Sequence, residues 1–120
     1  MSEATTQAES VRNWMSRLRF ARISPRKVRL IVDLVRGRSC SDAMEQLRFN
    51  RRRAARFVQA VLRSAMVSAD EAEADMRRLY VSEARVDDGP HFRRWRPKDR
   101  GRVHPIEKRT SHITVKVAEG

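Results

Sequence analysis

The chain has 120 residues, enough for one domain of ordinary size and too few for two. Lys and Arg number 27 against 15 Asp and Glu, so a net charge of +12 opposes compaction and predicts a polyanionic partner. The sequence contains no apolar run near the length of a membrane span, no signal peptide and no lipidation motif, which argues against a membrane as that partner.

The N-terminal residues carry little pattern. Residues 1–10 are polar and without periodicity, and we expect 1–16 to form a flexible extension. Trp14 would dock on the domain or on RNA, or would be a loosely packed aromatic residue of the surface. From Arg17 basic and apolar residues alternate, which predicts a short strand with Leu18 and Phe20 on one side. Residues 17–118 are therefore expected to form the single domain.

Ser24 and Pro25 predict the start of the first helix. Ser is a favourable N-cap, and Pro loses nothing at the first helical position, where its missing N–H would be unpaired. Apolar residues at helical spacing extend the helix to about Arg36, and Gly37 ends it.

Two further helices follow. Ser39 with Asp42 three residues later approximates a capping box and starts a short helix through Leu47. Asn50 then caps the longest helix, 51–70, which carries a continuous apolar stripe.

Cations crowd the starts of the first and third helices, where the helix dipole disfavours positive charge. They are Arg26, Lys27 and Arg29 in the first helix and Arg51, Arg52, Arg53 and Arg56 in the third. A solvated charged face is one explanation for the third helix. An RNA phosphate held at each helix start is the explanation we favour.

Two strands lie in the second half of the chain. Residues 79–86 predict one strand, with Tyr80, Ser82, Ala84 and Val86 on one side. Residues 113–117 alternate apolar and polar and predict another. The acidic cluster 70–75 lacks the spacing of a calcium loop and is expected on the outward, solvent-facing side.

The segment 91–109 between these strands is the main candidate binding device. It has eight basic and two acidic side chains, half of the protein's charge surplus, with Phe92 and Trp95 interleaved among arginines. Aromatic rings and guanidinium groups stack on bases, and arginine contacts phosphate bidentately. Its three flanking and internal prolines (Pro90, Pro97 and Pro105) oppose a helix, so we expect an extended arm that grows from the sheet.

Three other functions were weighed. A basic linker or localisation signal would not need the aromatics or the position between two strands. A free RNA- or DNA-binding regulator explains the charge but not the arm. A nuclease would use His91, His104 or His112, yet no catalytic, metal-binding or cofactor motif accompanies them. Cys40 is interpreted as a small apolar residue in a reducing compartment.

Three stretches resemble the family of bacterial large-subunit ribosomal protein twenty-two. They are ISPRKVRLIVDLVRGRS at 23–39, LYVSEARVDDGPHFRRWRPKDRGR at 79–102 and EKRTSHITVKV at 107–117. The combination of KRTSHITV with the upstream VDDGP and RPKDRGR is specific, and the resemblance covers 17–118. The chain departs from the family pattern in 1–16, in 67–75, at Trp95 and at His104-Pro105.

The resemblance implies an α+β domain: three helices packed on a small three-stranded antiparallel sheet, with a long protruding β-hairpin arm at about 86–110. It implies a cytoplasmic, non-enzymatic constituent of the large ribosomal subunit that binds 23S ribosomal RNA and neighbouring ribosomal proteins and supports assembly. Its arm would line the exit tunnel and meet the nascent peptide. No cofactor, metal or small-molecule substrate is implied.

Two groups of residues carry over from the resemblance. The expected RNA-binding residues are Arg22, Ser24, Arg26, Lys27, Arg93, Arg94, Arg96, Lys98, Arg100, Arg102, Lys108, Arg109, Ser111 and His112. The residues expected at the tip of the arm are Gly89, Pro90, His91, Phe92, Arg93, Arg94 and Trp95.

Overall fold

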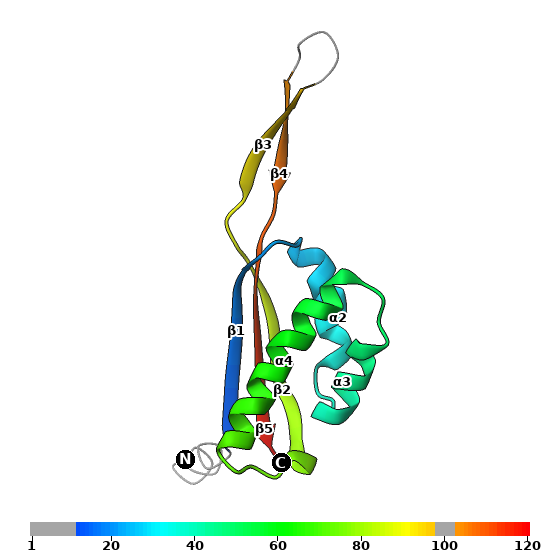
Figure 1. Ribbon diagram of the computed structural model, residues 1–120, viewed down its shortest axis with the longest axis vertical. Helices are drawn as coiled ribbons and strands as arrows, with labels where there is room; N and C mark the ends of the chain where they lie inside the picture. The colour runs from blue at the N-terminus through cyan, green and yellow to red at the C-terminus, as the bar shows by residue number, and fades with distance from the viewer. Residues whose placement is uncertain (1–11, 98–102) are drawn as a thin grey trace, which may run out of the picture.

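The computed structural model describes residues 12–97 and 103–120, and along 92–107 the description concerns the backbone only. Three helices cover one face of a three-stranded antiparallel sheet of order β1-β5-β2, and a separate two-stranded sheet, β3-β4, projects from one end of this body (Figure 1). The α+β class and the arm expected from the resemblance are confirmed.

The first two helices begin where their capping residues predict, whereas the third begins at Arg53 with Arg52 as its N-cap, and Asn50 Oδ1 accepts the Arg52 N–H at 2.9 Å outside the helix. α4 packs on β1 and β5, α2 packs on β2, and α3 packs on the other two helices. α2 follows Ser24 with Pro25 at its start, and Ser39 Oγ accepts the Asp42 N–H at 3.2 Å at the start of α3. The helices are α2 (Pro25–Val35), α3 (Cys40–Arg48) and α4 (Arg53–Glu71), with a 3-10 turn η1 (Met76–Arg78) after them.

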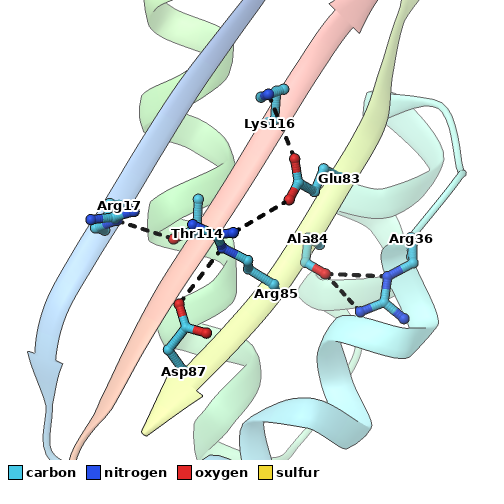
Figure 2. A network of polar contacts seen from close by, with 8 residues as sticks. All are labelled: Arg17, Arg36, Glu83, Ala84, Arg85, Asp87, Thr114 and Lys116. Atoms are coloured by element: carbon cyan, nitrogen blue, oxygen red, sulfur yellow. Dashed lines mark hydrogen bonds and ion pairs between the residues drawn. The ribbon is translucent and has the colours of Figure 1, made fainter. Parts of the chain in front are cut away.

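The sheet has its most apolar strand at the centre. The strands are β1 (Asn13–Ala21), β2 (Leu79–Asp88) and β5 (Ser111–Glu119). Ile113, Val115 and Val117 of β5 are fully buried beneath the helices, which confirms the alternation read from the sequence. On the open face Thr114 is also buried, and Arg17 Nε donates to its Oγ1 at 3.2 Å (Figure 2).

The first strand is longer than the alternation predicted. It begins at Asn13, where it pairs with Ala118, and not at Arg17. Trp14 is half-buried against the hydrophobic core, and the Arg12 guanidinium lies 5.0 Å from the centroid of its ring. Of the three alternatives for Trp14, docking on the domain is the one that the structure shows.

Two register shifts correct the predicted strand faces. Between Leu18 and Ala21 the pairing of β1 with β5 shifts, so Phe20 is exposed and does not share the core side with Leu18. Between Val81 and Glu83 the pairing of β2 with β5 shifts in the same way. Tyr80 and Ser82 consequently face outward while Ala84 and Val86 face the core, because an extra residue in one strand turns the following side chains over.

The edge strand β2 is partly covered by the segment after α2. Gly37 adopts a φ of +80°, and its N–H donates to the Val81 carbonyl at 3.0 Å. The Val81 N–H in turn donates to the Arg38 carbonyl at 2.8 Å. Arg36 adds two side-chain donors to the Ala84 carbonyl, at 2.6 and 3.2 Å (Figure 2). These bonds satisfy backbone groups that an edge strand would otherwise leave open.

Cys40 is a buried residue of the core, as its sequence context predicted. Burial raises the pKa of its thiol from 9.0 to about 11. Between these values the unfolded chain loses the thiol proton before the folded chain does, so the free energy of unfolding should fall by about 2–3 kcal/mol as pH rises through this window. Urea unfolding at a series of pH values from about 8 to 11 measures the fall.

Cys40→Ala is the control for that fall, because tyrosine and lysine titrate in the same range. The variant should be less stable at neutral pH, through the lost side-chain volume, and should lose less stability than the parent above pH of about 9. Parallel pH curves for the two proteins would contradict the assignment.

The arm continues β2 and β5 beyond the body through a short joint. β3 (Phe92–Pro97) pairs with β4 (Val103–Lys108) in antiparallel register from Phe92↔Lys108 to Pro97↔Val103. At the joint the Gly89 N–H donates to the Thr110 carbonyl at 2.9 Å, and the buried Thr110 hydroxyl donates to the Pro90 carbonyl at 2.7 Å. A Cβ at Gly89 would overlap the Thr110 side chain, so this position requires glycine.

Candidate nucleic-acid interface

Unpaired cations gather at the end of the domain from which the arm projects, which we call the arm end. The starts of α2 and α4 both lie there (Figure 1). Arg29 near the start of α2 lies 3.8 Å from Asp88, but nine other basic side chains of this end are exposed and form no ion pair in the described part of the chain. They are Arg22, Arg26, Lys27, Arg51, Arg52, Arg53, Arg56, Lys108 and Arg109.

The opposite end of the domain carries the acidic cluster. α4 ends there, and the exposed acidic residues that follow are Asp70, Glu71, Glu73 and Asp75. Arg12 and Arg78 at this end are each 3.8 Å from a carboxylate oxygen of Glu119. Among the described residues, the arm end is therefore rich in unpaired cations and the far end is charge-compensated, so the arm end is the better surface for a polyanion.

A hollow of about 360 Å³ lies between the starts of α2 and α4. Its lining residues are Ile23, Lys27, Arg52, Arg53 and Ala54. Lys27 from the first group of helix-start cations and Arg52 and Arg53 from the second thus line one hollow, a proximity that the sequence could not predict.

The placement of charge in this hollow works against the two helices that form it. α3 follows the dipole rule, with Asp42 in its first turn and Arg48 in its last. α2 and α4 have no acidic residue in the first turn, and neither has a side-chain cap at its N-terminus. Pro25 has no N–H, and the N–H groups of Lys27 and Ala55 donate to the carbonyls of Ser24 and Arg52, so it is mainly the exposed cations beside these helix starts that remain available to an external anion.

Charges on the open face of the sheet neutralise one another. Figure 2 shows Arg85 of β2 between two acidic residues of the same strand, 3.8 Å from Glu83 and 3.6 Å from Asp87. Lys116 of the central strand lies 3.6 Å from Glu83. This part of the surface is paired internally and is a weaker candidate for phosphate than the arm end.

Ser111 requires a correction. The resemblance placed it among the RNA-binding residues, but it is fully buried and its hydroxyl donates to the Ile23 carbonyl at 2.5 Å. Together with Thr110 it fastens β5 to the segment before α2 and to the arm. A polar residue of a basic motif was predicted to contact RNA, but its hydroxyl instead forms a hydrogen bond inside the protein at the base of the arm.

The residues expected at the tip also lie elsewhere. Gly89, Pro90 and His91 are at the base of the arm, beside Thr110. Phe92 to Trp95 lie along the outgoing strand β3. β3 ends at Pro97 and β4 begins at Val103, so the expected tip residues do not lie at the far end of the described strands.

The predicted arm cations fall into two groups. Arg93, Arg94 and Arg96 belong to β3, in register with Glu107, Ile106 and His104 of β4. Lys98, Arg100 and Arg102 lie outside the described residues.

One aromatic residue at the arm end was missed as a site residue. Phe20 has a positive φ of 58°, the residue is 55% exposed, and its N–H donates to His112 Nδ1 at 3.1 Å. The two rings meet edge to face, with centroids 4.9 Å apart and planes at 84°. Ser24, the N-cap of α2, is half-buried close by in sequence.

Two other kinds of site were searched within the described ranges. In 12–97 and 103–120 no helix is both long and apolar enough to span a membrane. The same residues contain no group of three or more His, Cys, Asp or Glu side chains placed to hold a metal ion.

Comparison with known proteins gives one consistent result. The family model for ribosomal protein L22p/L17e matches residues 16–118. A relative from Lactobacillus helveticus, named large ribosomal subunit protein uL22, is 44% identical over 113 residues, which cover 93% of this chain and 97% of the relative. Relatives of the same name from Geobacter sulfurreducens and Rubrobacter xylanophilus are each 48% identical, over 87% and 82% of this chain and 95% and 79% of their own lengths.

Proposed function

We propose, from the premise that this chain belongs to the ribosomal protein L22p/L17e family, that it binds 23S ribosomal RNA through its arm end and lines the nascent-peptide exit tunnel with its arm. The chain is a structural constituent of the large ribosomal subunit and not an enzyme. In this role it contacts neighbouring ribosomal proteins in the cytoplasmic subunit and supports its assembly.

The observation that carries the proposal is the hollow between α2 and α4, at the same end of the domain as the arm. Two helix starts and unpaired cations converge there without an acidic residue in either first turn. Such an arrangement costs stability in the free protein and is offset when phosphates enter, because helix N-termini and arginine both bind phosphate.

The arm supports the second half of the proposal. Its strands form a sheet of their own that extends away from the helices, so the arm can enter a narrow space while the body stays outside (Figure 1). The basic residues of β3 would hold RNA along the arm, and the far ends of the strands at Pro97 and Val103 lead toward the nascent peptide. The RNA contacts proposed in the body and at the base of the arm are Arg22, Ser24, Arg26, Lys27, Lys108, Arg109 and His112.

Sedimentation tests the assignment to the subunit. Tagged protein should co-migrate with large subunits through a high-salt wash, because a protein inserted among RNA segments is not released as a peripheral one is. Recovery mainly in the free fractions would count against the proposal.

A paired charge variant tests the hollow. Lys27→Gln with Arg53→Gln should weaken binding to 23S RNA by roughly tenfold and make the salt dependence of log K shallower by about 1–2, because two phosphate contacts are lost. The free protein should keep its stability or gain a few tenths of a kcal/mol, because both cations oppose a helix dipole. Filter binding at several salt concentrations and thermal unfolding measure the two effects.

Arg63→Gln with Arg77→Gln is the matched control. It removes the same charge from exposed residues, one on α4 beyond its first turn and one in the turn η1. Its salt dependence should stay close to the parent's. Equal losses in both double variants would mean that total charge, and not the hollow, drives binding.

A further inference from the structure

Phe20 is held in a backbone conformation that its residue type disfavours. Its φ of 58° lies in the left-handed region, where a Cβ-bearing residue other than Asn or Asp is strained. The conformation is imposed by the register shift between Leu18 and Ala21, after which β1 turns toward α2. Such strain persists only where the surrounding structure holds it, and it concentrates at functional positions.

The strained conformation does not bring the Phe20 side chain into the hydrophobic core. Leu18 packs on the core and Ala21 is buried, whereas Phe20 leaves 55% of its surface in water. Phe20 is not among the residues packed against the core, and Asn at this position would accept the same φ with less strain. The exposed ring is therefore the feature that packing alone does not explain.

His112 fixes the orientation of that ring. Its Nδ1 accepts the Phe20 N–H at 3.1 Å, and its ring meets Phe20 edge to face. Because Nδ1 is an acceptor, the proton of the neutral imidazole lies on Nε2, which is then a donor. The pair thus presents an aromatic face beside a hydrogen-bond donor.

The surroundings of the pair favour a nucleic-acid occupant. Arg19 and Arg22 flank Phe20 in sequence, both are exposed, and neither forms an ion pair within the described residues. An exposed ring among unpaired arginines suits an unstacked base whose phosphates lie on either side.

We propose that Phe20 and His112 form a stacking platform for one unpaired RNA base. This inference rests on the proposed RNA binding and adds to it a contact with a base, distinct from the phosphate contacts of the hollow. The base stacks on the Phe20 ring, and His112 Nε2–H donates to an acceptor on the base or its sugar.

The test uses the full-length protein and 23S RNA, with Phe20→Asn as the main variant. Asn keeps the left-handed backbone and removes the ring, so circular dichroism and thermal unfolding should remain those of a folded domain. Affinity should fall by about tenfold, the loss typical of one stacked base. The plot of log K against log salt should shift in parallel, because no phosphate contact is removed.

Two further variants separate stacking from other effects. Phe20→Trp keeps an aromatic face and should retain the parent's affinity. Phe49→Asn is the matched control: Phe49 is 79% exposed, but its φ is −92° and the Arg48 guanidinium already lies over its ring at 5.9 Å. Its affinity should be unchanged.

The outcomes distinguish the two proposals. Parent-like affinity of Phe20→Asn would overturn the platform and leave the proposed RNA binding intact. A change of salt slope in that variant would also overturn it, because the residue would then be positioning cations. Failure of the parent protein itself to bind 23S RNA above other RNAs would sink both.

Discussion

Replacing Val61 with Asp is expected to unfold the free domain under conditions in which the parent is folded. Val61 is 3% exposed and lies on the apolar stripe of α4, beneath which β5 runs. A buried carboxylate without a partner costs about 3–5 kcal/mol, a large part of the total stability of about 5–15 kcal/mol typical of a domain. Thermal unfolding followed by circular dichroism should show Tm lowered by about 15 °C or more, or no cooperative transition.

Val67→Asp gives the comparison that isolates burial. It makes the same substitution on the same helix, but Val67 is 51% exposed. Its free energy of unfolding should change by no more than about 0.5 kcal/mol. Similar losses in both variants would mean that helix propensity or net charge, and not the core, sets the stability.

Removing the arm should have the reverse consequence: an intact domain that no longer holds RNA tightly. Replacement of 92–107 by a short turn deletes β3 and β4, which pair with each other in a sheet separate from the body. Tm should therefore stay close to the parent's. The deletion removes six basic and two acidic side chains, so affinity for 23S RNA should fall by on the order of a hundredfold at physiological salt, with a markedly shallower salt dependence.

The deletion has two informative failures. Loss of the helical circular dichroism signal would show that the arm stabilises the body, contrary to a domain that folds without it. Unchanged affinity would place RNA binding wholly in the body. A variant with Arg93, Arg94 and Arg96 replaced by Gln keeps the length of the arm and tests its charge alone.

Most of the helices and strands could be predicted from the sequence, because buried apolar residues recur with the period of a helix or of a strand. The stripe of α4 and the alternation of β5 are local patterns, as are the Ser39 cap and the glycine after α2. The faces of Phe20 and Tyr80 were predicted incorrectly for one shared reason. A register shift depends on how a strand pairs with its neighbour β5, and no local pattern in β1 or β2 contains that information.

The same distinction between local pattern and tertiary packing applies to the candidate site. The positive charge of the site could be predicted from the sequence, because the arm is rich in arginine and both helix starts carry cations that the helix dipole disfavours. The hollow could not, because Lys27 and Arg53 become neighbours only when α2 packs on α4. Ser111 was misjudged because a motif shows residue types and not burial. The strain at Phe20 likewise has no signature in the residues around it.

The joint at the base of the arm also determines how accurately the arm is aimed. Gly89 and Thr110 are hydrogen-bonded to each other at the base of the arm, and β3 begins shortly after them and continues for six residues, about 20 Å. A swing of about 10° at such a pivot moves the far end of β3 by roughly 3–4 Å. A methyl group added at Gly89 would overlap Thr110 and tilt the arm at its base. The resulting displacement would increase along β3, so the position of its far end depends on the absence of a side chain at Gly89.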